Sequence, residues 1–479
     1  MNYATSLMMS LPEVILTLGA LVLLMIAAFK GDKATGLVSG LAVALLVAAA
    51  FSLIGPAGHG GEAFDGLYRA DAFAAFAKVL IYVAAAVSIL IAPGFFAKTE
   101  PLRAEYPLLI VLAAVGMGMM VSAGDLMTLY VGLELNSLAS YVLASFMRRD
   151  TRSAEAGLKY FVLGALASGI LLYGISLLYG FTGTTLFDGV AAAMKDDLST
   201  GELFGLVFVM SGLAFKISAV PFHMWTPDVY EGAPTPVTTF FASAPKVAAM
   251  ALTVRIAVEA MGPATSAWQQ IIIFAALASI VLGAVAAIGQ TNIKRLLAYS
   301  SINNVGFALV GLAAGTPEGV SAVMTYMAIY VAMTLGSFLC VLQMRDAEGN
   351  HLETIQSLSG LSRTRPALAA ALAIFMFSLA GIPPLLGFWS KFVVFDAAVA
   401  AGLWPLAAIG IAASVIGAYY YLRIIKVMYF DEPAPAYRAP DSYLESGMIA
   451  VCAIAVSPLG YFLIPLLGLT SMNAARALF

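Results

Sequence analysis

Long apolar runs separated by short polar segments make up almost the whole chain. A helix of about 20 apolar residues is long enough to cross the hydrocarbon core of a bilayer. Fourteen such runs can be delimited, at residues 11–29, 36–54, 71–92, 106–122, 124–146, 155–180, 203–222, 235–258, 267–288, 296–314, 319–342, 366–398, 403–428 and 444–466. The pattern predicts an all-α polytopic membrane protein with about fourteen transmembrane helices.

The composition supports the same class. Of the 479 residues, 61% are hydrophobic and 11% are charged, and the mean hydropathy is +0.94. Soluble domains carry about 25% charged residues. No basic segment precedes the first run, so we expect a retained helix and not a signal peptide. Cys340 and Cys452 fall in apolar runs, and we expect them to be core residues without a disulfide.

Proline interrupts two of the runs. In 203–222, Pro221 lacks an N–H, and its ring clashes with the carbonyl of Ile217. The run 366–398 is too long for one straight helix, and Pro384 lies near its middle. Irregular backbone at membrane depth is tolerated only where it is buried in protein or lines a wet cavity. We therefore predict two broken helices, the first with an open, water-attracting carbonyl beside Lys216.

The two breaks suggest an internal repeat. Ser211-Gly212-Leu213-Ala214 precedes Pro221, and Ser378-Leu379-Ala380-Gly381 precedes Pro384. The breaks are five spans apart, and units offset by an odd number of spans have opposite topology. The alternative is chance similarity between helices rich in Ala, Gly and Leu. The predicted units are N-terminal helices 1–3 (residues 1–105), two inverted five-helix repeats (spans 4–8, 106–258; spans 9–13, 267–428), and helix 14 (444–479).

Lysine and arginine concentrate in alternate loops. Examples in the odd-numbered loops are Arg148, Arg149, Arg152, Lys294 and Arg295. The even-numbered loops and both tails carry only Arg69, Lys195 and Arg476. Because cytoplasmic loops are enriched in positive charge, this bias predicts that both termini lie on the outer side.

Ionisable residues at membrane depth are candidate functional residues, because a charged side chain there costs about 3 kcal/mol on insertion scales. Glu134 lies mid-span, Lys216 lies at the first break, Lys246 follows a mid-span proline, and Lys391 lies two turns beyond the second break. Burial disfavours a charged lysine and a nearby carboxylate favours it, so a lysine that gains or loses such a partner can load and release a proton. The set predicts a proton relay; static ion pairs are the alternative.

Two further residues are weaker candidates. Lys159 lies one turn inside its span and could extend back to the interface. His223 follows the first break, where a hydrogen-bonded structural role is an equal alternative. Charged residues nearer span ends are expected to be mostly interfacial anchors; these are Lys78, Arg255, Arg423 and Lys426.

Polar side chains without charge gather in spans 10 and 11. Span 10 carries Tyr299, Ser300, Ser301, Asn303 and Asn304. Span 11 carries Tyr326, Tyr330 and Thr334 but no ionisable group, so a proton wire crossing it is expected to need water.

The sequence has no P-loop, no Rossmann glycine pattern, no CxxC and no cluster of metal ligands. We expect no cofactor in this chain, and no nucleic-acid partner.

The stretch Phe215-Lys216-Ile217-Ser218-Ala219-Val220-Pro221-Phe222-His223-Met224-Trp225-Thr226-Pro227 and its continuation to Val237 resembles the signature of the antiporter-like subunits of respiratory complex I, which are similar to subunits of multisubunit cation/proton antiporters. Three stretches narrow the resemblance to the subunit N family of bacterial NADH–quinone oxidoreductase: 132–138 around Glu134, 243–246 ending at Lys246, and 387–392 around Lys391. The resemblance covers nearly the whole chain.

The resemblance implies fourteen helices with two inverted repeats. It implies that Glu134 and Lys216 form the pair of the first half-channel, that Lys246 is the central relay and that Lys391 is the exit-side lysine, with Lys159 and His223 on the same path. It also implies a bacterial inner membrane location. NADH, FMN, iron–sulfur clusters and quinone would belong to partner subunits, and the contacts of this chain would be other membrane-arm subunits, both antiporter-like and small, and lipid.

Three functions remain open at this stage. The first is a proton-translocating subunit of complex I, without redox chemistry in this chain. The second is a subunit of a sodium/proton antiporter, which would show sodium dependence. The third is a membrane scaffold, in which neutralising all four mid-membrane charges would leave transport intact. The resemblance favours the first.

Overall fold

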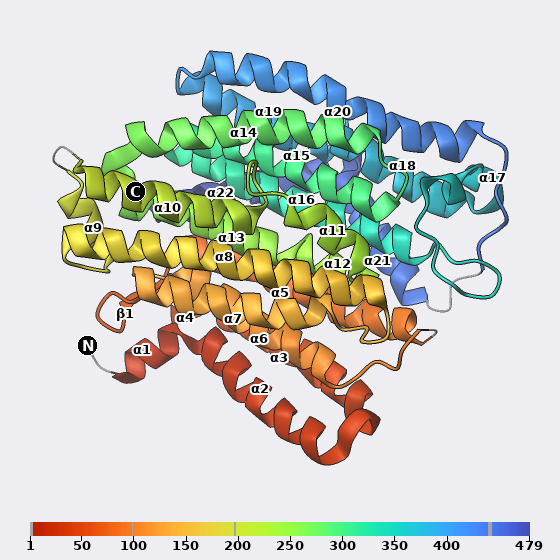
Figure 1. Ribbon diagram of the computed structural model, residues 1–479, viewed down its shortest axis with the longest axis horizontal. Helices are drawn as coiled ribbons and strands as arrows, with labels where there is room; N and C mark the ends of the chain where they lie inside the picture. Colours follow the sequence, from red (N-terminus) through yellow and green to blue (C-terminus); the bar gives the residue numbers. More distant parts are fainter. Residues whose placement is uncertain (1–2, 98, 196–197, 439–442) are drawn as a thin grey trace.

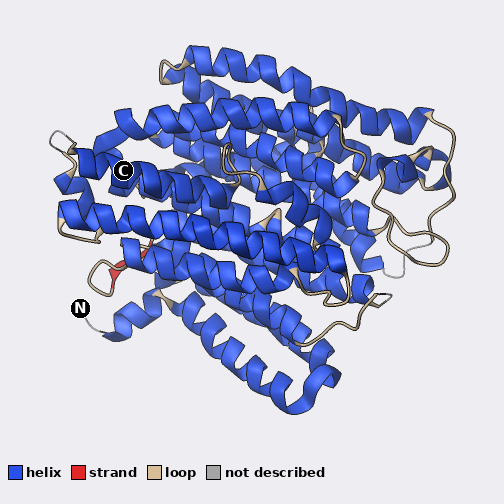
Figure 2. Ribbon diagram, in the orientation of Figure 1, coloured by secondary structure: helices blue, strands red, loops and turns tan. Residues whose placement is uncertain are grey.

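The computed structural model describes residues 3–97, 99–195, 198–438 and 443–479. Most of them are helical (Figure 2). The long helices lie side by side along the longest dimension of the molecule, so that their ends gather at two opposite ends (Figure 1). A small antiparallel hairpin, β1 (Gly61–Ala63) and β2 (Tyr68–Ala70), lies at the end that also carries the N-terminus.

The helices of the first half follow the predicted runs. They are α1 (Tyr3–Met9), α2 (Leu11–Lys30), α3 (Thr35–Ser52), α4 (Pro56–His59), α5 (Ala72–Phe96), α6 (Glu105–Ser122), α7 (Leu126–Ala144), α8 (Thr151–Thr182), α9 (Phe187–Ala193), α10 (Thr200–Ile217), α11 (Trp225–Gly232), α12 (Thr235–Phe241) and α13 (Ala244–Arg255). A π-helical turn, Ile256–Ala260, continues α13.

The second half continues in the same way. Its helices are α14 (Thr265–Ile288), α15 (Ile293–Ala313), α16 (Pro317–Leu342), α17 (Leu361–Thr364), α18 (Pro366–Ala380), α19 (Leu386–Ala400), α20 (Trp404–Phe430), α21 (Tyr443–Val456) and α22 (Ile464–Arg476). Short 3-10 turns lie at Gly31–Ala34, Gly262–Ala264, Ile355–Leu358 and Pro458–Leu463.

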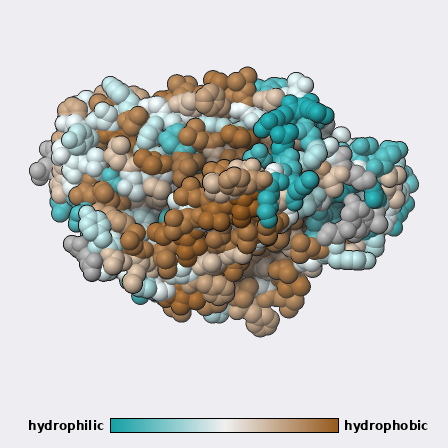
Figure 3. Space-filling view, turned by 90° about the horizontal axis from the view of Figure 1, so that it is seen from below, coloured by the Kyte–Doolittle hydropathy of each residue, from teal (hydrophilic) through white to brown (hydrophobic). Residues whose placement is uncertain are grey.

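The helices confirm a polytopic membrane protein. Within the described ranges, eleven helical stretches are long and apolar enough to cross a bilayer, or up to twelve if a bent pair is one span. The first stretch, Leu11–Ser52, joins α2 and α3, which the sequence predicts as two spans. Seen from below, the surface is apolar across the middle, with hydrophilic residues gathered toward one end (Figure 3).

Both predicted breaks are present. The first separates α10 from α11, and the second separates α18 from α19. Two runs predicted to be straight are also interrupted. The run 235–258 is divided into α12 and α13, because Pro245 enters the first turn of α13. The run 444–466 bends by 66° after α21, where Pro458 begins a 3-10 turn.

Side-chain caps fix where several long helices begin. Asp71 caps α5 by accepting from the N–H of Ala74, and Asp125 caps α7 by accepting from the N–H groups of Met127 and Thr128. Such caps satisfy amide groups that have no partner inside the helix. They set the register in which the charged side chains of these helices face their neighbours.

Candidate functional site

At the first break, a lysine from another helix, Lys246, binds the C-terminal end of α10. Ile217 is the last residue of α10, and Ser218 follows in a left-handed conformation with φ of +64°. The Nζ of Lys246, on α13, donates to the carbonyl oxygen of Ile217 at 3.0 Å and also contacts the Ser218 hydroxyl. Thr226 donates to the same hydroxyl at 2.6 Å. The carbonyl expected to lie open beside Lys216 is therefore bound by a different lysine.

The second break repeats this arrangement. The Nζ of Lys391 donates to the carbonyl oxygen of Ala380, the last residue of α18, at 3.0 Å. It lies 4.4 Å from the ring centroid of Phe307. Gly381, with φ of +82°, makes room for the lysine, because an added Cβ would lie 2.9 Å from its Cδ. At both breaks a lysine amine lies at the negative end of a helix dipole.

Glu134 and Lys216 face the same region without a direct contact. Lys216 Nζ donates to the Ser137 hydroxyl at 2.7 Å, and that hydroxyl donates to the carbonyl of Leu133 at 2.6 Å. Ser137 lies one turn from Glu134 on α7. Oε1 of Glu134 is buried and has no hydrogen-bond partner among the described residues. A buried carboxylate oxygen without a partner leaves room for a water or a transferred proton.

The two secondary candidates lie in different surroundings. His223 lies in the first break, half-buried, and its Nδ1 has no partner within the described part of the chain. Lys159 is 41% exposed and pairs with Glu155 at 2.7 Å and with Asp228 at 2.8 Å. Lys159 thus belongs to a partly exposed network of charges.

This network covers one end of the molecule. Asp228 also pairs with Arg295 at 2.6 Å, and Arg295 pairs with Glu231 at 3.0 Å. The carboxylates Asp228 and Glu231 lie on α11, directly beyond the first break. The network therefore touches the broken helix that carries the lysine sites.

Glu353 holds a second part of the network. It accepts from Arg152 at 2.7 Å and from the buried Lys294 at 3.1 Å. Burial favours the neutral form of this carboxyl, but Lys294 and Arg152 outweigh burial and hold the pKa of Glu353 at about 2. A cavity of about 500 Å³ opens beside these three residues. Sequence inspection missed Glu353 because a loop carboxylate carries no signal until its partners are known.

Uncharged groups form a chain between spans 10, 11 and 13. Tyr326 donates to Asn304 Oδ1 at 2.6 Å, and the amide of Asn304 donates to the hydroxyl of Tyr421 at 3.3 Å. Ser300 and Tyr421 share a hydrogen bond of 2.5 Å. Tyr330 donates to Ser301 at 2.9 Å. The first three bonds join Tyr326, Asn304, Tyr421 and Ser300 into one chain, and the bond between Tyr330 and Ser301 is separate from it.

The prediction of interfacial anchors is wrong for Lys78 and Arg255. Both side chains are fully buried, Lys78 pairing with Glu13 at 2.6 Å and Arg255 with Asp71 at 2.7 Å. Glu13 and Asp71 are distant in sequence from the residues they bind, which a search of single spans cannot reveal, although Arg255 also pairs with the nearby Glu259 at 3.0 Å. Lys426, by contrast, is exposed and pairs with Asp431, in agreement with the prediction.

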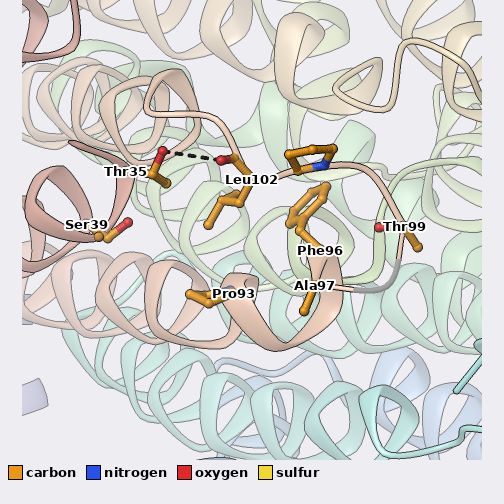
Figure 4. Close-up of a pocket in the computed structure, with 9 residues that line it drawn as sticks. Thr35, Ser39, Pro93, Phe96, Ala97, Thr99 and Leu102 are labelled. Atoms are coloured by element: carbon orange, nitrogen blue, oxygen red, sulfur yellow. Dashed lines mark hydrogen bonds between the residues drawn. The ribbon is translucent and has the colours of Figure 1, made fainter. Parts of the chain in front are cut away.

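Two further cavities differ in their surroundings. One of about 230 Å³ is lined by the charge network, including Lys159, Asp228 and Arg295. A hollow of about 430 Å³ between α3 and α5 is lined mostly by apolar groups, with Thr35 donating to the carbonyl of Leu102 at 3.3 Å (Figure 4). Among the residues that the structure describes, no group of three or more His, Cys, Asp or Glu could hold a metal ion. Cys340 and Cys452 are free, as predicted.

Comparisons with known proteins identify the family. A model described as NADH:quinone oxidoreductase/Mrp antiporter, TM, matches residues 123–417. The chain belongs to this family. A relative from Rhizorhabdus wittichii, named NADH-quinone oxidoreductase subunit N, is 72% identical over the full length of both chains. The resemblance inferred from the sequence is confirmed.

Solved structures of the family share the fold. A chain of respiratory complex I from Thermus thermophilus, with bound aureothin, is 31% identical with a TM-score of 0.81, covering 95% of this chain and 97% of that one. A chain of the Mrp complex from Dietzia has a TM-score of 0.85 at 23% identity, covering 99% and 98%. The latter shows the fold alone.

Replacing Glu353 should lower stability in a pH-dependent way. Glu353→Gln leaves Lys294 buried without its carboxylate, and hydrogen bonds to charged groups contribute about 1.5–3 kcal/mol. Because the folded pKa of about 2 lies below the ordinary value, this contribution is present at pH 7. It declines as pH falls from about 4.3 toward 2. The unfolding temperature of the purified complex should be lower for the variant than for wild type at pH 7, and this difference should be smaller at pH 3. A difference that does not change with pH would contradict this account.

Proposed function

We propose that this chain translocates protons in the membrane arm of a bacterial NADH:quinone oxidoreductase, as a subunit of the N type. The observation that carries the proposal is the pair of broken helices, each with a buried lysine on its terminal carbonyl, at Lys246 and Lys391. The 72% identity to a named subunit N supports the same conclusion. NADH oxidation and quinone reduction, with FMN, iron–sulfur clusters and quinone, belong to partner subunits.

The proposed route begins at Glu134 and Lys216. Their separation by Ser137 allows two states, one in which Lys216 is charged beside the carboxylate and one in which its proton has moved on. Lys246 is the central relay. Lys391 is the exit-side group, and Lys159 and His223 have secondary roles near the path.

The helix ends explain why the lysines can retain a proton in a buried setting. A terminal carbonyl carries partial negative charge, which stabilises a nearby ammonium. The same ammonium is penalised by burial. A neighbouring charge that appears or disappears then shifts the balance between the charged and neutral forms. Titrations of such neighbours are coupled, so one loaded lysine opposes loading of the next.

The finer architecture is part of the proposal. We infer fourteen spans, with inverted repeats formed by α6–α13 and α14–α20. The packing supports this, because α6 contacts α7 and α13, and α14 contacts the corresponding α15 and α20. The concentration of Arg152, Lys294 and Arg295 at one end supports a cytoplasmic location for that end. Both termini would then lie on the outer side of the inner membrane.

The alternative function is that of a sodium/proton antiporter subunit. The fold similarity to a chain of an Mrp complex favours it, but that similarity concerns the fold alone. The same buried charges would serve either function.

Co-purification separates the two functions. When the C-terminus is tagged and native membranes are extracted in mild detergent, we expect NADH oxidation and bound flavin to travel with this chain. Other membrane-arm subunits, both antiporter-like and small, should travel with it. Recovery of a membrane complex without flavin, together with sodium-dependent proton flux in vesicles, would favour the antiporter.

Neutralising the first pair should stop pumping without loss of assembly. Lys216→Met keeps most of the length of the side chain and removes its titratable amine, and Glu134→Gln keeps the shape of the carboxyl. We expect each to lower the initial rate of proton uptake in vesicles by at least tenfold. Lys426→Met, at an exposed pair, is the matched control and should pump normally. Normal pumping by assembled Lys216→Met would refute the assigned roles.

We also propose that the hydroxyl and amide chain carries the proton across span 11. Tyr326→Phe removes one oxygen and breaks the bond to Asn304. We expect slower pumping with unchanged assembly, because the rest of the ring still packs. Tyr106→Phe, which loses a buried hydrogen bond to the carbonyl of Ser88 away from this chain of groups, is the control. Equal pumping rates in the two variants would show that water alone bridges the region.

A further inference from the structure

A buried ion pair lies among the N-terminal helices, outside the residues 123–417 that match the family. Lys78 on α5 and Glu13 on α2 are 2.6 Å apart. The side chain of Lys78 is fully buried and that of Glu13 is 9% exposed. The proposed route through Lys216, Lys246 and Lys391 does not use this pair.

The hydroxyl of Tyr68 hydrogen-bonds to both members of the ion pair, so the three side chains form a triangle. Lys78 donates to the Tyr68 oxygen at 2.7 Å, and Tyr68 donates to Oε2 of Glu13 at 2.6 Å. Tyr68 lies on β2, in the loop that precedes α5. Burial, and then the charge of Glu13, raise the pKa of the Tyr68 phenol, so the phenol keeps its proton as a donor. Each of the three groups therefore has the other two within hydrogen-bond distance.

Unpartnered hydroxyls lie around the triangle. Tyr82 Oη and Ser122 Oγ are buried and have no hydrogen-bond partner within the described part of the chain. Gly118 on α6 lets the Glu13 carboxylate approach closely, because a Cβ there would lie 2.4 Å from Glu13 Oε1 and 3.4 Å from Tyr82 Oη. Ser122 is one turn further along α6, on the same face. Buried polar atoms without partners usually bind ordered water, so we expect a water beside these hydroxyls.

The neighbouring charges are held in fixed pairs. Arg255 binds Asp71 and Glu259, and Arg69 binds Glu259 at 3.1 Å and Asp188 at 2.8 Å. Guanidinium groups do not lose their protons in proteins, so Arg69 and Arg255 are fixed charges. Asp71, the N-cap of α5, lies two turns before Lys78, and Asp188 is 73% exposed. The two arginines therefore carry no exchangeable proton, which leaves the triangle as the candidate for proton exchange.

We propose that Glu13, Lys78 and Tyr68 form a second proton-exchange site, at the end of the molecule that carries Asp188. The inference rests on the proposed function. In the ion-paired state one proton resides on the Lys78 amine and none on Glu13. When Tyr68 passes its proton to Glu13 and takes one from Lys78, the pair becomes neutral with the number of protons unchanged. Loss of the carboxyl proton to the adjacent water empties the site, and a second proton reloads the amine.

The competing account is that the ion pair only stabilises the fold, as a structural strut. A double variant that neutralises both charges separates this account from proton exchange. Removing both charges of a buried pair is often neutral or stabilising, whereas removing one leaves an uncompensated charge. Glu13→Gln/Lys78→Met, in the whole complex, should therefore assemble. We expect it to move fewer protons per NADH oxidised in proteoliposomes. A wild-type ratio would overturn the proposal.

Tyr68→Phe gives an independent test that leaves the ion pair in place. We expect a lower ratio of protons to NADH, whereas a strut predicts no change; an unchanged ratio overturns the proposal even if the double variant fails to assemble. Tyr106→Phe is the matched control. Lys216→Met is measured in parallel: if it loses pumping while the Glu13 and Lys78 variants do not, only the second site fails. Normal pumping by Lys216→Met would instead reject the proposed function.

Discussion

The contact between a lysine ammonium and the last carbonyl of a broken helix is the interaction on which the site depends. A break in a transmembrane helix exposes carbonyl groups that cannot turn to bulk water, and each needs a donor. Lys246 and Lys391 are those donors. Each lysine satisfies the backbone, and the backbone in turn makes a buried charge tolerable. Neither feature would be stable alone, so the helix break and the charge form one unit.

The polar groups around these lysines keep the number of buried charges small. Glu134 supplies negative charge near Lys216 without contacting it. The Ser137 hydroxyl, on the same helix as Glu134, accepts the hydrogen bond from Lys216 instead. In the second half, uncharged phenols, hydroxyls and amides on α15, α16 and α20 hydrogen-bond to one another. Groups that both donate and accept can pass a proton without holding net charge. The membrane interior thus carries few charges and many neutral relays, which limits the cost of burial.

The sequence predicts correctly the features that depend on residues close together in the chain. Proline inside an apolar run identified both helix breaks, and isolated charges identified the four mid-membrane residues. It did not reach the carbonyl that each lysine binds, because the register between α10 and α13 is a tertiary property. For the same reason Lys78 was taken for an anchor: Glu13, its partner, lies 2.6 Å away in space but on another helix. The bend at Pro458 also lies at a proline inside an apolar run, so the same local signal for it is present in the sequence.

The two lysines reach their carbonyls by different connections. Lys391 lies on α19, the second half of the helix that it caps, so this contact is closed within one broken helix. Lys246 belongs to α13, whereas the carbonyl of Ile217 belongs to α10. The other end of α13 is tied through Arg255 to Asp71, the N-cap of α5. The first contact therefore joins two separate helices, α10 and α13, and through them the N-terminal helices. The second contact joins only the two halves of one broken helix.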